Sequence, residues 1–404
     1  MKELKKVSRF VYNCKRCGMC GNKVTAKVPY VCPIRKATPG FEQFYARGKI
    51  IIAQGLLEGR LSWSPEVARA LYSCTLCGNC MTQCAATDAD RNEPMVATTK
   101  IVEAMRADLL RDYPDGVPRA YHQVLTATQQ YENPWRLPRA TRKQWYTGLE
   151  VIEAGTEPAE MLLFAGCTIA SSPVLAERAR RAVQVLNSAG IRPAVLGSRE
   201  VCCGSVQRKI GAVSLAQELM EKNISLINRS SCTKVVTLCA GCFGTLSTEY
   251  RTAAQPLAAE VVHMVELLAA LVRDKKLTFR KSRQLTVAYH DPCHVGRHAG
   301  IFNQPRAVLA ALPGITLVER RATREHTICC GAGGGMRLFD DGTLAAKIGA
   351  AAVAEAAAVG AQALVSACPF CEMNLAAGAA ELKEELPVYD IIDLVYESLA
   401  PEPR

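Results

Sequence analysis

The chain contains Lys234-Val-Val-Thr-Leu-Cys-Ala-Gly-Cys242 and, 129 residues later, Ala363-Leu-Val-Ser-Ala-Cys-Pro-Phe-Cys371. In both stretches a short apolar run ends at a Cys-x2-Cys pair. Such runs predict strands of a sheet. In α/β sheets, functional groups gather where the strands end. The two copies therefore predict a duplicated α/β fold with a cysteine site at the edge of each sheet.

The duplication includes three more cysteines in each copy. Cys293 follows Cys167 by 126 residues, and Cys329-Cys330 follows Cys202-Cys203 by 127 residues. Five cysteine positions in register over such a span indicate an internal repeat. We expect strands at 161–166, 193–196, 234–238, 285–289 and 363–366, and helices at 173–189, 211–228 and 344–359. This alternation predicts parallel sheets in two repeats, 159–280 and 281–404.

Eight further cysteines lie in residues 1–110, for which we expect an α-helical domain. Cys14-x2-Cys17-x2-Cys20 and Cys74-x2-Cys77-x2-Cys80 have the spacing of cubane [4Fe-4S] sites, whereas zinc sites more often use two separate pairs. In two-cluster ferredoxins the fourth ligand of each run binds the other cluster. An inserted loop at 21–31 precedes Cys32, and Ala85 follows Cys84 where a proline is usual. We assign the first cubane to Cys14, Cys17, Cys20 and Cys84, and the second to Cys74, Cys77, Cys80 and Cys32.

Each repeat contains a lone cysteine, an adjacent pair and a Cys-x2-Cys. Adjacent cysteines cannot easily direct both thiolates to one tetrahedral zinc ion. They can bind different irons, so five soft ligands favour an iron–sulfur cluster that departs from cubane geometry. Eighteen of the nineteen cysteines are then used. The remaining one, Cys232, is expected to be a structural thiol.

Composition excludes several classes of protein. The 404 residues are 49% hydrophobic and 22% charged, as in globular proteins, and nineteen cysteines in a long chain do not suit a disulfide framework. The N-terminus lacks a secretory signal, and no uncharged apolar stretch is long enough to span a membrane. We therefore expect a cytoplasmic protein that reaches the cytoplasmic face of a membrane only through a partner.

The formal net charge is +11. Part of this surplus is expected to offset bound cubanes, each of which carries about −2 with its four thiolates. We identify neither a nucleic-acid-binding module nor a concentrated basic stripe, and expect no nucleic-acid partner. Gly331-Ala-Gly-Gly-Gly-Met336 does not complete a dinucleotide fingerprint, because Met336 stands where the third glycine is needed. We therefore expect no flavin or NAD bound by the chain itself.

Residues 111–158 contain no cysteine and are rich in Pro, Trp and Tyr. They predict an extended linker, a strap held on the surface by its aromatic side chains. The basic stretch at 136–143 is interpreted as a solvated face, with docking of a partner as the alternative. His290, His298 and His326 are expected to support the second five-cysteine motif. His294, next to Cys293, is the residue we select for proton delivery to a departing thiolate.

Tyr289-His-Asp-Pro-Cys-His-Val-Gly-Arg297 and Cys329-Cys-Gly-Ala-Gly-Gly-Gly-Met336 resemble the cysteine-rich CCG domain of the heterodisulfide reductase D family. The same domain occurs in the iron–sulfur subunits of glycolate oxidase and anaerobic glycerol-3-phosphate dehydrogenase. Ala46-Arg-Gly-Lys49 and Leu71-Tyr-Ser-Cys-Thr-Leu-Cys-Gly78 extend the likeness to the N-terminal half. The resemblance implies an α + α/β chain, in which a helical ferredoxin-like domain with two cubanes precedes two duplicated CCG repeats.

The resemblance also implies one noncubane [4Fe-4S] cluster for each complete motif. Its ligands are Cys167, Cys202, Cys203, Cys239 and Cys242 in the first repeat, and Cys293, Cys329, Cys330, Cys368 and Cys371 in the second. In the first repeat no Asp-Pro precedes the lone cysteine, and the Cys-x2-Cys lacks its proline. A weaker or differently ligated first noncubane cluster therefore stays open.

In the disulfide-reducing members of the family, the two noncubane clusters bind and split a disulfide between them. Our first hypothesis is therefore an oxidoreductase subunit that reduces a disulfide or oxidises thiols, with Cys167, Cys293 and His294 as catalytic residues. Its electrons come from a redox partner, a flavoprotein or a membrane cytochrome b. The second hypothesis is a pure relay between a flavoprotein dehydrogenase, or an electron-transferring flavoprotein, and a quinone or membrane cytochrome. Two complete motifs favour the first hypothesis.

Overall fold

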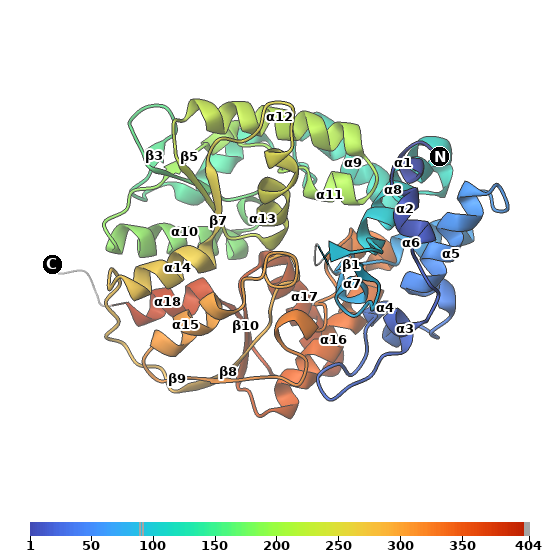
Figure 1. Ribbon diagram of the computed structural model, residues 1–404. Coiled ribbons are helices and arrows are strands. Elements are labelled where there is room, and N and C mark those ends of the chain that lie inside the picture. Colours follow the sequence, from blue (N-terminus) through green and yellow to red (C-terminus); the bar gives the residue numbers. More distant parts are fainter. Residues whose placement is uncertain (89, 91–92, 400–404) are drawn as a thin grey trace.

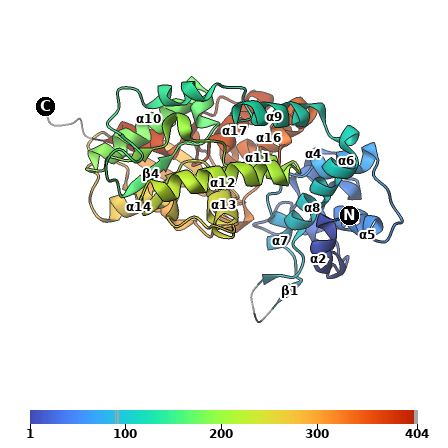
Figure 2. The ribbon, with the colours of Figure 1, turned by 90° about the horizontal axis from the view of Figure 1, so that it is seen from above.

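The computed structural model describes residues 1–88, 90 and 93–399. Figure 1 shows the helices of the N-terminal region (blue to cyan) beside two α/β units, with the first repeat (green to yellow) above the second (orange to red). In the view from above (Figure 2), α10 (Pro173–Ser188) and α14 (Met264–Arg273) lie at the end of the molecule opposite the N-terminal helices. Among the described residues, no helix has both the length and the apolar character that crossing a lipid bilayer requires.

Helices make up nearly all of the regular secondary structure of the N-terminal region, as its sequence indicates. Buried Leu71, Ile101 and Met105 pack together at its centre. A short antiparallel pair, β1 (Thr87–Asp88) and β2 (Glu93–Pro94), is its only sheet among the described residues. The helices are α1 (Glu3–Lys6), α2 (Ser8–Tyr12), α3 (Met19–Asn22), α4 (Pro33–Ala37), η1 (Glu42–Phe44), α5 (Ala46–Leu57), α6 (Pro65–Tyr72), α7 (Asn79–Thr82) and α8 (Thr98–Asp112).

The segment that follows differs from the expected extended linker. It contains η2 (Pro114–Gly116), the 13-residue helix α9 (Arg119–Tyr131) and η3 (Arg139–Tyr146). The prediction of an extended strap was wrong because α9 has its own apolar face, on which Tyr121 and Val124 are buried. Aromatic anchoring is present at Trp145 and Tyr146, which join the core of the repeats. The basic stretch is not all solvated, because Arg142 is buried in an ion pair with Glu200.

Each repeat has a parallel sheet of the same topology. The first is ordered β3 (Ile152–Glu153), β5 (Ala194–Val195), β4 (Met161–Phe164), β6 (Lys234–Thr237), β7 (Glu260–His263). The second is ordered β9 (Ile315–Val318), β8 (Leu285–Tyr289), β10 (Ala363–Ser366), β11 (Val388–Asp390). All strand pairs in both sheets are parallel. The order from β5 to β7 matches that from β9 to β11, so the duplication in the sequence is also a duplication of fold.

Helices of one repeat pack against those of the other. In addition to α10 and α14, the first repeat has η4 (Ile169–Ser171), η5 (Gly197–Arg199), α11 (Ser205–Lys209), α12 (Val213–Arg229), α13 (Ala240–Ser247) and η6 (Glu249–Arg251). The second has α15 (Asn303–Ala311), η7 (Arg324–His326), η8 (Met336–Gly342), α16 (Thr343–Ala358), α17 (Pro369–Leu382) and α18 (Ile391–Ser398). The contacts pair α10 with α18 and α14 with α15, and Figure 1 shows these four helices together where the two repeats meet. One hydrophobic core therefore extends through both repeats.

Candidate iron–sulfur sites

The cysteines of both repeats lie at strand ends and helix starts. Cys167 follows β4 and Cys293 follows β8, while Cys239 and Cys368 are the N-cap residues of α13 and α17. Backbone N–H groups at the start of a helix lack partners within the helix and favour negative charge. The helix starts at Cys239 and Cys368 therefore offer N–H groups to a bound anionic cluster.

A glycine ends each adjacent cysteine pair. Gly204 and Gly331 have left-handed φ angles of 84° and 95°. A Cβ on Gly331 would lie 2.5 Å from the carbonyl oxygen of Ala345, and one on Gly204 would lie 2.9 Å from that of Ala216. Only glycine fits this turn, which directs the preceding pair of thiols back toward the strand ends.

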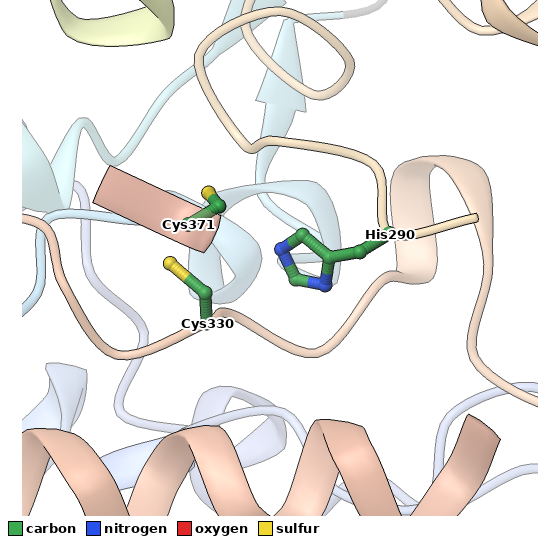
Figure 3. A group of neighbouring side chains, drawn as sticks. All are labelled: His290, Cys330 and Cys371. Carbon is green, nitrogen blue, oxygen red and sulfur yellow. The ribbon is translucent and has the colours of Figure 1, made fainter. Parts of the chain in front are cut away.

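The five thiols of the second motif form one buried group. Figure 3 shows the sulfurs of Cys330 and Cys371 and the ring of His290 directed toward one another, and their donor atoms all lie within 4.8 Å. Cys329 hydrogen-bonds to Cys293 and Cys330. The members are Cys293, Cys329, Cys330, Cys368 and Cys371. The expected ligands of the second noncubane site are therefore close together.

The first motif forms a similar group. The Sγ atoms of Cys167 and Cys202 are 3.5 Å apart. Cys203 hydrogen-bonds to Cys202 and Cys242, and Cys239 hydrogen-bonds to Cys242. All five thiols are buried.

The electrostatics of both groups fit a metal cluster. Interactions with Cys202 and Cys242 lower the pKa of Cys203 to about 6. In the second motif, the interaction of Cys371 with Cys330, together with burial, raises the pKa of Cys371 well above the usual value. Crowded buried thiols must share protons in this way, since several thiolates together need a cationic partner. Backbone N–H groups also face the sulfurs: Gly331 N lies 3.3 Å from Cys329 Sγ. Soft donors around a shared centre, with N–H groups behind them, suit iron–sulfur ligation.

The eight N-terminal cysteines fall into two neighbouring groups. Burial raises the pKa of Cys20 to about 11, and the thiols of Cys14, Cys32 and Cys84 add to the rise. Burial likewise raises the pKa of Cys84, which also interacts with Cys17 and Cys14. The second group contains Cys32, Cys74, Cys77 and Cys80, which line one small cavity. Each expected fourth ligand, Cys84 or Cys32, therefore lies beside the run of cysteines to which it was assigned.

Sulfur contacts link three of the four groups. The thiol of Cys77 in the N-terminal region lies close enough to that of Cys329 in the second repeat to interact with it. The thiol of Cys239 in the first repeat interacts in the same way with that of Cys368 in the second. The remaining group is also near, because Cys20 interacts electrostatically with Cys80. The cysteine sites therefore form one continuous series through the molecule.

A cavity of about 270 Å³ adjoins the second five-cysteine group. Cys293, Cys330, Cys368 and Cys371 line it, but no cysteine of the first motif does. A smaller cavity adjoins the thiols of the first motif. Ser205, Gly241 and Phe370 line both cavities, so they form the wall between them. The structure thus places Cys293 and His294 at the cavity and Cys167 behind its wall.

The charged residues of this cavity were missed by the sequence analysis. Lys209 and Arg337 line it, and no carboxylate does within the described chain. Lys209 Nζ donates to His294 Nε2 at 2.8 Å, so the proton of the neutral ring is on Nδ1, which faces Cys293 Sγ at 3.3 Å. No sequence signal identifies Lys209, because 85 residues separate it from His294.

The other expected histidines take different positions. His290 joins the thiols of Cys330 and Cys371. His298 and His326 instead contact the N-terminal region. The ring of His298 fills the space next to Gly78, and His326 Nδ1 lies 2.8 Å from Gln83 Nε2. Two histidines thus hold the loop of the second Cys-x2-Cys-x2-Cys run against the second repeat.

Comparisons with known proteins match this arrangement. The profile of the cysteine-rich CCG domain matches residues 161–247 and 287–376, and that of a 4Fe-4S dicluster domain matches residues 10–87. The chain is 34% identical to the D component of the dihydromethanophenazine:CoB--CoM heterodisulfide reductase of Methanosarcina barkeri, over 96% of this chain and 93% of that protein. The chain belongs to the heterodisulfide reductase D family. The resemblance expected from the sequence is confirmed, and the protein is an iron–sulfur oxidoreductase subunit.

Other relatives of this heterodisulfide reductase D-family chain are longer. It is 31% identical to the probable iron-sulfur-binding oxidoreductase FadF of Bacillus subtilis, over 81% of this chain but 46% of that protein. It is 28% identical to the EtfAB:quinone oxidoreductase of Syntrophomonas wolfei, over 93% of this chain and 53% of that protein. A hypothetical protein from Helicobacter pylori shares the fold, with a TM-score of 0.56 and 9% identity over the whole of this chain and 72% of that chain.

Proposed function

We propose that this protein reduces a disulfide, or oxidises two thiols, in the cavity next to the second five-cysteine group. The observation that carries the proposal is the contact between two complete five-cysteine groups, at Cys239 and Cys368, beside a cavity that no carboxylate of the described residues lines. A relay would need no such cavity. Two cationic side chains, Lys209 and Arg337, favour a substrate that carries negative charge, as a thiolate does.

Two cubane and two noncubane [4Fe-4S] clusters are proposed for the four groups. When bound, they supply one-electron transfer between a redox partner and the sulfur atoms of the substrate. The cubane ligands are Cys14, Cys17, Cys20 and Cys84, and Cys74, Cys77, Cys80 and Cys32. The noncubane ligands are Cys167, Cys202, Cys203, Cys239 and Cys242, and Cys293, Cys329, Cys330, Cys368 and Cys371.

The chain's own residues orient the substrate and supply a proton. His294 Nδ1 is held toward Cys293 by the hydrogen bond from Lys209 to the opposite ring nitrogen. A hydrogen-bond donor at this position can stabilise a leaving thiolate beside Cys293. If the ring gives up its Nδ1 proton to that thiolate, the ammonium group of Lys209 can replace it at Nε2. Cys293 and His294 are thus proposed as catalytic residues. Cys167 is proposed as a cluster ligand only, because the wall at Phe370 separates it from the cavity.

The partner is proposed to be a flavoprotein or a membrane cytochrome b, since the chain shows no nucleotide-binding fingerprint. All nineteen cysteines are described and free of disulfides. That state suits a reducing compartment, so we propose a cytoplasmic location.

The test is a titration of the holo-protein with two thiols of similar size, mercaptoacetate and cysteamine, while paramagnetic signals are recorded. We expect a signal that appears only with thiol, and at lower concentration with anionic mercaptoacetate than with cationic cysteamine. Lys209→Gln should reduce that preference. Cys232→Ser is the matched control, because Cys232 belongs to no proposed cluster site and its Sγ donates to the carbonyl of Ser230. Absence of any thiol-dependent signal would instead support the relay function.

A further inference from the structure

The basic charge of the chain is concentrated in its N-terminal region. Residues 4–41 contain nine lysines and arginines and no aspartate or glutamate. The rest of the chain has a net charge of only +2. A first cubane with four thiolates would offset about two of these nine charges, and Lys6 pairs with Glu3, so about six remain.

The same segment contains the most accessible of the proposed cluster ligands. Among the nineteen cysteines, all of which the structure describes, Cys17 alone is exposed. Two large apolar side chains are exposed in the surrounding sequence: Tyr12 at the end of α2 shows 53% of its surface, and Val24 after α3 shows 65%. Exposed apolar side chains near an accessible redox centre are typical of a contact surface.

Three of the four cations near Cys17 in the sequence have no side-chain partner among the described residues, and the fourth, Arg16, donates a hydrogen bond to Gln54. Lys15, Arg16 and Lys27 are exposed, and Lys23 is half-buried. None of these four forms an ion pair with a described residue. Glu42, the first carboxylate after this segment, is already neutralised by Arg47, whose Nε lies 2.5 Å from it. Glu58 interacts electrostatically with Arg16, so the described chain compensates the positive potential at this surface only in part.

We propose that the surface formed by Tyr12, Lys15, Arg16, Cys17, Lys23, Val24 and Lys27, here called the Cys17 face, docks an acidic surface of the redox partner protein. The proposal rests on that part of the proposed function in which a partner protein supplies electrons. Opposite charges accelerate the encounter of redox partners, and such interfaces are small and transient. A protein is favoured over nucleic acid or an anionic membrane, because only a redox protein makes use of an exposed cluster ligand.

The experiment measures where an acidic redox protein binds. The probe is a plant-type ferredoxin, a small acidic protein, mixed with the holo-protein at low ionic strength. A carbodiimide joins lysine amines to carboxylates only where they touch, and mass spectrometry identifies the joined lysines. We expect Lys15, Lys23 and Lys27 to dominate over Lys275 and Lys276, which are exposed near α14 at the other end of the molecule.

Affinity gives an independent readout. Lys15→Glu/Lys23→Glu should weaken ferredoxin binding at least about tenfold and flatten its dependence on salt, whereas Lys275→Glu/Lys276→Glu should change it less than about twofold. Lys23→Glu/Lys27→Glu replaces the first variant if iron content shows that Lys15→Glu disturbs the cluster.

Three results would overturn the proposal: equal weakening by the control variant, joined lysines spread over both ends of the molecule, or tighter binding to duplex DNA or anionic vesicles than to ferredoxin. The thiol-dependent signal of the proposed function is measured without a partner protein. Loss of docking therefore leaves that signal intact, and absence of the signal leaves the docking result intact.

Discussion

Replacement of Glu200 by Gln tests how the segment after α8 is fastened to the first five-cysteine motif. Glu200 and Arg142 form an ion pair in which both side chains are about 95% buried. The same Glu200 oxygen accepts a 2.9 Å hydrogen bond from the backbone N–H of Gly166, the residue before Cys167. One carboxylate thus joins residues 139–146 to the loop that presents a proposed cluster ligand.

The expected cost follows from burial. Gln keeps the acceptor for Gly166 but leaves the Arg142 guanidinium buried without a counter-charge, and guanidinium does not lose its proton. Breaking a buried pair from one side costs about 3–5 kcal/mol. Arg142→Met/Glu200→Leu removes both charges and should recover much of this loss.

Hydrogen exchange of the peptides around Arg142 and Gly166 measures the effect. A loss of about 3–5 kcal/mol accelerates exchange by local opening about 100- to 4,000-fold. Glu160→Gln is the control, because Glu160 is 71% exposed where it pairs with Lys234 and such pairs contribute less than about 1 kcal/mol. Acceleration below about fivefold in Glu200→Gln, similar to the control, would show that the buried pair does not fasten this segment.

Three other side chains give further predictions. Cys32→Ser should lower the iron content of anaerobically prepared protein by up to about four atoms, whereas Cys232→Ser should leave it unchanged, as chemical iron analysis would show. Burial lowers the pKa of His263 to about 4. As the pH falls, the histidine of the unfolded protein therefore takes up a proton before that of the folded protein, and the free energy of unfolding should fall by about 1 kcal/mol from pH 7 to pH 5.5. In unfolding measurements, His263→Gln should reduce this dependence on pH. Bound mercaptoacetate should protect the thiols of the cavity from alkylation, and Arg337→Gln should weaken that protection several-fold. Protection by cysteamine should change little. Equal changes for both ligands would contradict a preference based on charge.

The strands and helices that the sequence predicted in the repeats occur close to the expected residues, whereas others, such as β9, α15 and α17, were not predicted. Strands 285–289 and 363–366 occur as β8 and β10, and the helix expected at 173–189 occurs as α10, Pro173–Ser188. These elements are short-range features of apolar pattern and helix capping. The segment 111–158 was predicted poorly, because its Pro and Trp residues concealed the apolar face of α9.

The sequence by itself determined the chemistry of this protein, since a run of cysteines at two-residue intervals, or five cysteines repeated in register, specifies soft ligands whatever surrounds them. Only the tertiary structure decided how the groups meet. The contacts of Cys77 with Cys329 and of Cys239 with Cys368 join residues more than a hundred positions apart. The wall at Phe370, which separates Cys167 from the cavity, is also formed by residues far apart in the sequence. Such contacts depend on how helices and sheets pack across domains, and the spacing of residues along the chain contains no information about that packing.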